Sequence, residues 1–427
     1  MTTEVQSPAF AAQASSSDSV PRSDASGAVR YVARQPILDL QGRVHGYELL
    51  FRDGRTDTFS GDGDQASRTM LDNAMLFGLR RLTCGLPAFV NCTTETLTGT
   101  LVRLLPSGIA VLEILETVSP SPELINACRE LKKAGYRFAL DDFKWRTGIE
   151  PLIELANYIK VDFETTAVDE RRKLLHRLNG KTVSLVAERI ETQEEFIAAR
   201  NEGFNLIQGY YFCRPTLLKN RRVPANRLSH IEILRLLNEE SLDLRKLAWQ
   251  VKREAALTYR LLRLINSPAC AMRQEVRSVE AALIAVGEET FRRMATLAIA
   301  SELNTGQPSE LLRMAFVRGR CCELAAMFCG LNHTEQYLLG MLSLLPAMLR
   351  HPMEELTPTL PLREEIRRAL RGEDCPERSL LAWLEGHERG DWEGCNAIVR
   401  AYNLDQDSLS LCYEEAVMWA EDALHFS

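Results

Sequence analysis

The sequence predicts a TIM-like α/β barrel followed by an all-α domain, and three observations support this. Eight short apolar runs rich in β-branched residues occur in the first half, and amphipathic stretches separate most of them. Strand and helix alternating eight times is typical of a closed barrel. Most runs carry an acid, an amide or a lysine near their C-terminal end, where such barrels build active sites. After Arg227, apolar residues recur at helical spacing instead.

The eight expected strands are short and mostly apolar. They are Val29–Leu38, Val44–Arg52, Ala88–Cys92, Ile109–Leu115, Tyr136–Phe143, Tyr158–Phe163, Val183–Glu191 and Asn205–Phe212.

Two of the intervening helices have clear end signals. Pro122–Ala134 begins with proline near its first position and stops at Gly135. Thr192–Glu202 begins with a Thr-Gln-Glu-Glu capping box and ends before Gly203. At about 190 residues the barrel is smaller than the usual ~250, so we expect some helices to be short or missing.

Composition changes divide the chain into four segments. Residues 1–28 are rich in serine and alanine, and we expect a disordered tail there. The barrel is expected over 29–218, and the polar stretch 219–226, which contains a proline, is expected to be a linker. Residues 227–427 are the expected helical domain, including Ser278 as an N-cap.

Composition also narrows the class of protein. A net charge of −7 gives no electrostatic case for DNA as a partner. The first residues lack the pattern of a secretory signal, and the longest apolar segment, Tyr337–Leu349, is too short to span a bilayer. The eleven cysteines have no metal-type spacing. We therefore expect a cytoplasmic protein with reduced cysteines.

The polar residues at the expected strand ends would converge on one mouth of the barrel. They are Glu48, Asn91, Glu113, Asp141, Asp142, Lys160, Glu188, Glu191 and Gln208. Oxygen ligands of this kind suit Mg²⁺ or Mn²⁺, and such ions can activate a water in phosphodiester hydrolysis. A lysine among carboxylates could position or deprotonate that water. The alternative is that these residues form salt bridges that serve only the fold.

Eight ordered motifs identify the first half as similar to a known family. They are Arg34-Gln35-Pro36-Ile37, Glu48-Leu49-Leu50-Phe51-Arg52, Val90-Asn91-Cys92-Thr93, Glu113-Ile114-Leu115-Glu116, Asp141-Asp142-Phe143, Ile159-Lys160-Val161-Asp162, Ala187-Glu188-Arg189-Ile190-Glu191-Thr192 and Gln208-Gly209-Tyr210. Together they resemble an EAL domain, a β/α barrel of the type that hydrolyses cyclic di-GMP to linear pGpG.

The resemblance implies roles for eleven residues. It implies that Glu48, Asn91, Glu113 and Asp141 are metal ligands, and that Asp142 reaches a second metal. It implies that Lys160 activates water, with Glu188 and Glu191 as supporting acids. It implies that Gln35, Arg52 and Gln208 contact the ligand.

Two departures from the family pattern argue against efficient catalysis. After Phe143 the family has a Gly-Thr-Gly type loop, whereas this chain has Lys144-Trp145-Arg146. Lys144 is expected to donate a hydrogen bond to Asp142 or Glu116. Loss of the glycines from the loop after Phe143 removes access to backbone conformations with φ > 0. Arg189 also replaces a glycine, in the Ala187–Thr192 motif. These changes predict weaker turnover more than weaker binding.

The second half resembles an HDOD domain, a helical relative of HD phosphohydrolases. The similar segments are Leu262–Ser267, Arg277–Ala282 and Ala285–Gly287. The stretch that aligns with the metal-binding His-Asp pair of HD enzymes is Gly340–Leu345, which contains neither residue. We therefore expect a non-catalytic module that contacts a signalling protein.

The leading hypothesis is a bacterial signalling protein whose divergent EAL barrel recognises cyclic di-GMP, with weak or absent hydrolysis. One alternative is an active metal-dependent phosphodiesterase. Another is a fully degenerate scaffold that binds no nucleotide. A homodimer is compatible with all three.

Overall fold

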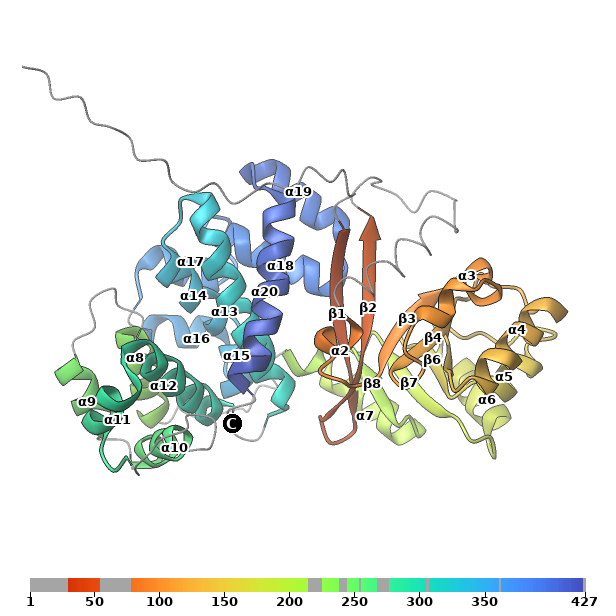
Figure 1. Ribbon diagram of the computed structural model, residues 1–427, viewed down its shortest axis with the longest axis horizontal. Coiled ribbons are helices and arrows are strands. Elements are labelled where there is room, and N and C mark those ends of the chain that lie inside the picture. The colour runs from red at the N-terminus through yellow and green to blue at the C-terminus, as the bar shows by residue number, and fades with distance from the viewer. Residues whose placement is uncertain are drawn as a thin grey trace, which may run out of the picture.

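Eight strands close into a barrel in the first half of the chain, as the sequence predicts (Figure 1). The strands are β1 Arg30–Asp39, β2 Val44–Asp53, β3 Ala88–Cys92, β4 Ala110–Ile114, β5 Arg137–Leu140, β6 Tyr158–Asp162, β7 Ser184–Glu188 and β8 Leu206–Gln208. The computed structural model describes residues 30–53, 78–213, 225–237, 244–252, 255–266, 276–304, 307–360 and 362–424. The expected tail, 1–28, and most of the expected linker, 219–226, lie outside them.

The predicted alternation of strand and helix is wrong at the start, because β1 and β2 form an antiparallel hairpin. The Asp39 carboxylate accepts hydrogen bonds from the backbone N–H of Gln41 and Arg43, both at 2.9 Å, and Gly42 has φ 77°. Such an aspartate, followed by a glycine in the left-handed region, makes a tight turn. β1 is also antiparallel to β8, while β2 to β8 are mutually parallel neighbours.

The barrel interior is built in two layers. The lower layer is an apolar cluster of one side chain from each of seven strands: Ile37, Phe89, Val111, Ala139, Tyr158, Val186 and Leu206. Side chains two residues apart on a strand point to the same face. Two residues beyond Phe89, Val111 and Tyr158 come Asn91, Glu113 and Lys160. The apolar layer therefore supports a polar layer at the mouth.

The barrel helices are α2 Leu79–Leu82, α3 Thr94–Thr98, α4 Pro122–Lys133, α5 Glu150–Leu155, α6 Val168–Leu178 and α7 Gln193–Glu202. Two of them, α4 and α7, begin and end with the signals that the sequence shows. Thr192 and Glu195 form the predicted capping box of α7, and Gly203 ends that helix in the left-handed conformation. Several helices have only four to six residues, which accounts for the small size of the barrel.

After residue 224, the described residues form helices and no strands, as the sequence predicts. The α-helices are α8 Ala225–Leu237, α9 Leu244–Lys252, α10 Ala255–Ile265, α11 Val279–Val286, α12 Glu288–Leu303, α13 Ser309–Cys329, α14 His333–Leu342, α15 Leu345–Leu349, α16 Met353–Leu356, α17 Glu364–Leu370, α18 Ser379–Arg389, α19 Trp392–Tyr402 and α20 Gln406–Leu424. Ser278 caps α11 by accepting a hydrogen bond from the backbone N–H of Ala281. Among the described residues, no helix combines the length and apolar character needed to cross a bilayer.

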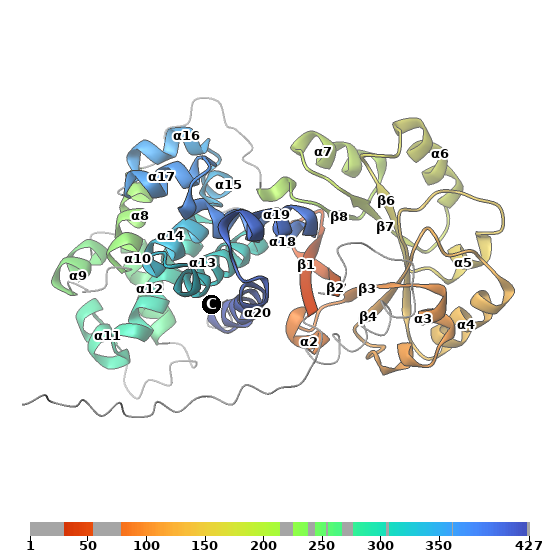
Figure 2. The same ribbon diagram turned by 90° about the horizontal axis from the view of Figure 1, so that it is seen from above.

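The helical half packs against the β1–β2 side of the barrel, with α18 and α20 nearest to it (Figure 2). The Tyr47 hydroxyl donates to Glu310 on α13 at 2.8 Å, and Arg34 pairs with Glu421 on α20 at 3.5 Å. Tyr47 and Arg34 are buried, so removing one partner would leave a desolvated polar group uncompensated. The two halves therefore share a buried interface.

His387 lies at this interface without contact with solvent. One ring nitrogen, Nε2, lies 3.1 Å from the backbone oxygen of Val32, and the ring packs between Trp383 and Tyr413. Burial lowers the pKa of His387 from 6.5 to about 4. The neutral ring therefore donates its Nε2–H to the carbonyl of Val32.

Because the pKa of His387 is lower in the folded state than in the unfolded state, its contribution to stability is lost as pH falls from 6.5 through about 4. We expect the wild type to lose on the order of 3 kcal/mol more than His387→Gln between pH 7 and pH 4. Glutamine keeps an N–H donor but does not titrate. Urea unfolding of both proteins at the two pH values checks this, and parallel losses would contradict it.

Candidate functional site

The polar layer at the barrel mouth brings together most of the predicted site residues. Those around the centre are Glu48 on β2, Asn91 on β3, Glu113 on β4, Asp141 after β5, Lys160 on β6, Glu188 on β7 and Gln208 on β8. They come from seven consecutive strands or strand ends, so the closed barrel is what makes them neighbours.

The ammonium group of Lys160 is the centre of the layer. Its Nζ lies 2.9 Å from carboxylate oxygens of Glu48, Glu113 and Glu188. It lies 2.8 Å from Asp141. Only 1% of the lysine side chain is exposed. Four acids therefore share one desolvated cation.

One positive charge does not balance four negative charges in a buried site. Burial raises the pKa of Glu113 and Asp141, and it raises that of Glu188 to about 8. Burial opposes the ionisation of Glu48 as well, but Lys160 and the hydrogen bond from Gln208 hold its pKa below the usual value. The layer therefore tends to take up protons or another cation.

Lys160 itself is charged in this arrangement. Burial lowers its pKa, but the four surrounding carboxylates outweigh that effect and raise it well above the usual value. An ammonium cannot accept a proton. Water activation by Lys160, which the resemblance implies, would therefore require that its carboxylates be neutralised by something else.

The donor set fits a hard divalent cation. Asn91 Oδ1, Glu113 Oε2 and Glu188 Oε2 are buried and accept no hydrogen bond from the residues that the structure describes. Buried oxygens without a partner are costly, and Mg²⁺ or Mn²⁺ prefers such ligands. In the described part of the chain, no three His, Cys, Asp or Glu side chains stand at the spacing of a metal chelate. The carboxylates are instead gathered on Lys160, with which a bound metal would compete.

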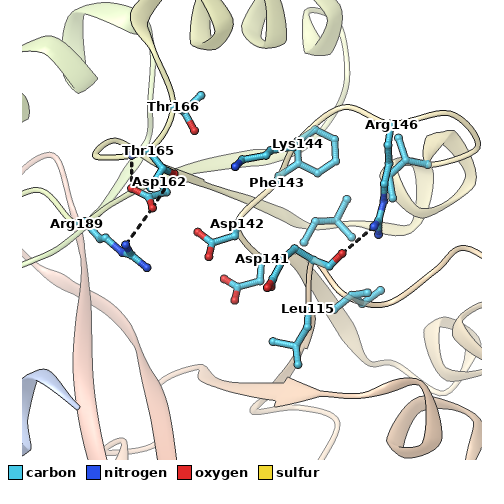
Figure 3. A pocket seen from close by; sticks show the side chains of 14 residues that line it. Leu115, Asp141, Asp142, Phe143, Lys144, Arg146, Asp162, Thr165, Thr166 and Arg189 are labelled. Atoms are coloured by element: carbon cyan, nitrogen blue, oxygen red, sulfur yellow. Dashed lines mark hydrogen bonds and ion pairs between the residues drawn. The ribbon is translucent and has the colours of Figure 1, made fainter. Parts of the chain in front are cut away.

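Asp142 faces an adjacent pocket of about 390 Å³, which Arg189, Lys144 and Arg146 also line (Figure 3). Arg189 pairs with Asp162 at 3.2 Å and with Glu164 at 3.5 Å. Asp142 and Arg189 both have positive φ, at 41° and 56°, which is strained for residues other than glycine. A fixed guanidinium therefore occupies the pocket beside Asp142.

The expected hydrogen bond from Lys144 to Asp142 or Glu116 is absent from the described residues, so that prediction is wrong. Arg146 takes part instead, because its guanidinium reaches the backbone oxygens of Glu116 and Val118. Both oxygens lie in the connection after β4. The changed loop thus ties two barrel connections together.

The remaining predicted residues lie around the rim. Gln208 donates to Glu48 at 2.7 Å and to Gln35 at 3.1 Å. Gln35 stands directly opposite Glu48 in the β1–β2 hairpin, because β1 runs in reverse. Glu191 is exposed after the end of β7 and does not join the four carboxylates on Lys160. The backbone of Arg52 in β2 lies opposite Tyr31 in β1, but the Arg52 side chain lies outside the described residues.

Gln35, Glu191 and Gln208 help to line a pocket of about 560 Å³, hereafter the rim pocket. That volume lies within the range of pockets that bind drug-sized ligands. Glu195 and Arg389 are among the lining residues that the sequence does not predict as site residues. The sequence indicates Glu195 only as part of a helix-capping box, and Arg389 comes from α18, far away in the sequence.

Comparisons with known proteins agree with the motifs. The EAL domain family matches residues 93–215, and the HDOD domain family matches residues 224–350. The cyclic di-GMP phosphodiesterase CdgJ of Vibrio cholerae is 33% identical over 399 residues, which covers 92% of this chain and 92% of that protein. The uncharacterised protein YuxH of Bacillus subtilis is 31% identical, over 92% of this chain and 98% of its own length. The chain therefore belongs to the family that joins an EAL domain to an HDOD domain.

Solved structures of EAL proteins resemble the barrel part. The complex of Klebsiella pneumoniae BlrP1 with manganese and cyclic di-GMP has 21% identity and a TM-score of 0.38, and the match covers 44% of this chain and 56% of that chain. The FimX EAL domain has 19% identity and a TM-score of 0.36, over 43% of this chain and 89% of that chain.

Lys160→Met removes the ammonium group that contacts all four carboxylates, so we expect a loss of about 3 kcal/mol in unfolding free energy at pH 8. The loss should be smaller at pH 5, because protonated carboxyl groups no longer repel one another. Lys173→Met, on the exposed face of α6, should stay within about 0.5 kcal/mol of the wild type. Urea unfolding at both pH values measures this; equal losses at pH 5 and pH 8 would be the contrary result.

Proposed function

We propose that this chain is a cyclic di-GMP signalling protein. Its barrel would bind the dinucleotide at the rim pocket, and hydrolysis to pGpG would be weak or absent. The observation that carries the proposal is the polar layer itself: four acids and Asn91 around Lys160, at the base of the rim pocket. The relative named as a cyclic di-GMP phosphodiesterase aligns over nearly the whole chain and supports the same substrate.

In this proposal Mg²⁺ or Mn²⁺ would be held by Glu48, Asn91, Glu113 and Asp141, with Asp142 reaching toward a second ion. When bound, such an ion would lower the pKa of a water and neutralise charge on the phosphodiester. Lys160 and Glu188 would position that water and take part in the transfer of its proton. Gln35 and Gln208 would orient the nucleotide through the amide groups that meet at the rim.

Weak turnover is supported by the charges beside Asp142. The Arg189 guanidinium, already paired with Asp162, faces the Asp142 pocket. A second metal at Asp142 would experience repulsion from that fixed positive charge. Binding of the nucleotide at the rim pocket would be less affected.

An active phosphodiesterase remains the second candidate. It is favoured because Glu48, Glu113, Asp141 and Lys160 are all present and in contact. The two candidates differ in rate and share a binding site.

For the helical half we propose a non-catalytic role in contacting a signalling partner. The segment that aligns with the HD metal motif is used for helix packing: a Cβ on Gly340 would lie 2.3 Å from the backbone oxygen of Arg318. The close approach of α13 and α14 depends on that glycine.

A calorimetric titration of the full chain with cyclic di-GMP, with and without Mn²⁺, followed by chromatography of the product, tests the proposal. Binding with little pGpG after long incubation is the expected result. Fast conversion would favour the second candidate, and absence of binding would leave a protein-interaction scaffold.

Metal binding has a separate prediction. We expect Mn²⁺ at about ten times its Kd to raise the Tm of the wild type by roughly 2 °C. Glu48→Gln combined with Asp141→Asn should abolish the rise. Asp169→Asn combined with Glu170→Gln, which makes the same charge change on exposed α6, should leave it intact. Differential scanning fluorimetry measures the Tm; a wild type unmoved by millimolar Mn²⁺ or Mg²⁺ would refute the metal site.

The proposed effect of Arg189 on the rate of hydrolysis can be tested by substitution. Arg189→Gly should raise the rate of pGpG formation about tenfold, because it relieves a strained φ and removes positive charge beside Asp142. Arg189→Lys keeps the charge and should not raise the rate. Single-turnover chromatography gives the rates, and a slower Arg189→Gly would show that the arginine assists the reaction.

A further inference from the structure

We propose that the helical half completes the nucleotide pocket, and that Arg389 binds a phosphate group of the ligand. This inference rests on the proposed function and names a ligand-contacting residue outside the EAL domain. Arg389 is the last residue of α18 and lines the rim pocket together with barrel residues.

The charge of the rim pocket makes Arg389 important. Seven acids line the pocket: Glu48, Asp141, Asp142, Glu164, Glu188, Glu191 and Glu195. Arg189 and Arg389 are the arginines in the same lining. A doubly anionic ligand needs positive charge there.

The two arginines differ in their partners. Arg189 is engaged with Asp162 and Glu164. Arg389 is exposed, and none of the described carboxylates pairs with it; its guanidinium carbon lies 5.9 Å from the centre of the Tyr210 ring. Its hydrogen-bond donors therefore remain available to a phosphate.

The end of α18 is fixed to the barrel rim by three consecutive residues. His387 bonds to the backbone oxygen of Val32, the Tyr210 hydroxyl donates to the backbone oxygen of Glu388, and Gln35 Nε2 donates to that of Arg389 at 3.1 Å. Tyr210 and Gln35 thereby satisfy two carbonyls that the helix terminus leaves unpaired, whereas His387 satisfies a carbonyl of β1. Gly390 then ends the helix in the left-handed conformation, where a Cβ would lie 2.8 Å from Leu50.

The same helix end is anchored within the helical half. The Arg318 guanidinium, on α13, donates to both carboxylate oxygens of Glu388, with the shortest bond at 2.7 Å. Both side chains are buried. The position of Arg389 is therefore set jointly by the barrel rim and the core of the helical half.

A continuous series of hydrogen bonds links this helix end to the centre of the site. Gln35 donates to the backbone oxygen of Arg389 and accepts from Gln208, and Gln208 donates to Glu48. Glu48 in turn contacts Lys160. Movement of α18 would thus alter both the phosphate contact and the orientation of Gln35.

The test compares the full-length wild type with Arg389→Ala, Arg389→Lys and Arg263→Ala by calorimetric titration with cyclic di-GMP, using Ca²⁺ in place of Mn²⁺. Arg263 is an exposed arginine on α10, distant in sequence from the site. Because a charge-assisted hydrogen bond is lost, Arg389→Ala should raise the Kd about 10- to 100-fold. Arg389→Lys should recover part of the affinity, and Arg263→Ala should bind like the wild type.

The outcomes separate this inference from the proposed function. Binding by Arg389→Ala as tight as that of the wild type overturns the role of Arg389 and leaves the proposed function standing. Failure of the wild type to bind overturns both. Equal Tm values for wild type and Arg389→Ala are expected because the side chain is exposed; weakened binding with a lowered Tm, unrelieved by lysine, would mean that Arg389 serves the fold instead.

Discussion

The buried ammonium of Lys160 is the interaction on which the rest of the site depends. Without it, the carboxylates of Glu48, Glu113, Asp141 and Glu188 would share a desolvated space without the cation that contacts all four. With it, the polar layer is held together but still carries excess negative charge. Burial, reinforced by the neighbouring carboxylates, raises the pKa of Glu188 to about 8. The excess negative charge makes a divalent cation a natural further occupant.

The reversed strand β1 connects this layer to the second domain. One side of β1 contributes Gln35, which stands opposite Glu48 and contacts Gln208. The strand also contacts α18, so the helical half packs beside the mouth of the barrel. The two domains are therefore joined at the proposed binding site and not only through the connecting segment.

Much of the barrel could be predicted from residue patterns. The runs around Ala88–Cys92 and Tyr158–Phe163 coincide closely with β3 and β6, since β-branched, apolar runs bounded by turns form strands. Phe89 and Asn91 point to the same face of β3 because they are two residues apart. An apolar residue followed two positions later by a polar one therefore predicts the apolar layer and the polar layer above it.

Other features depend on information that such patterns do not carry. An apolar run gives no strand direction, so the pattern does not predict the hairpin, although Asp39 and Gly42 mark its turn. Glu191 follows β7 after the strand has ended and therefore lies on the rim and not in the lumen. The contact of Gln35 with Arg389 joins residues 354 positions apart, which periodicity cannot reveal.

The most direct test of the central claim is anomalous X-ray scattering at the manganese edge from crystals of the full chain soaked in Mn²⁺. The account predicts a peak among Glu48, Asn91, Glu113 and Asp141, with Lys160 displaced from at least one of its carboxylates. Manganese peaks elsewhere in the molecule, with Lys160 still bound to all four acids, would contradict it.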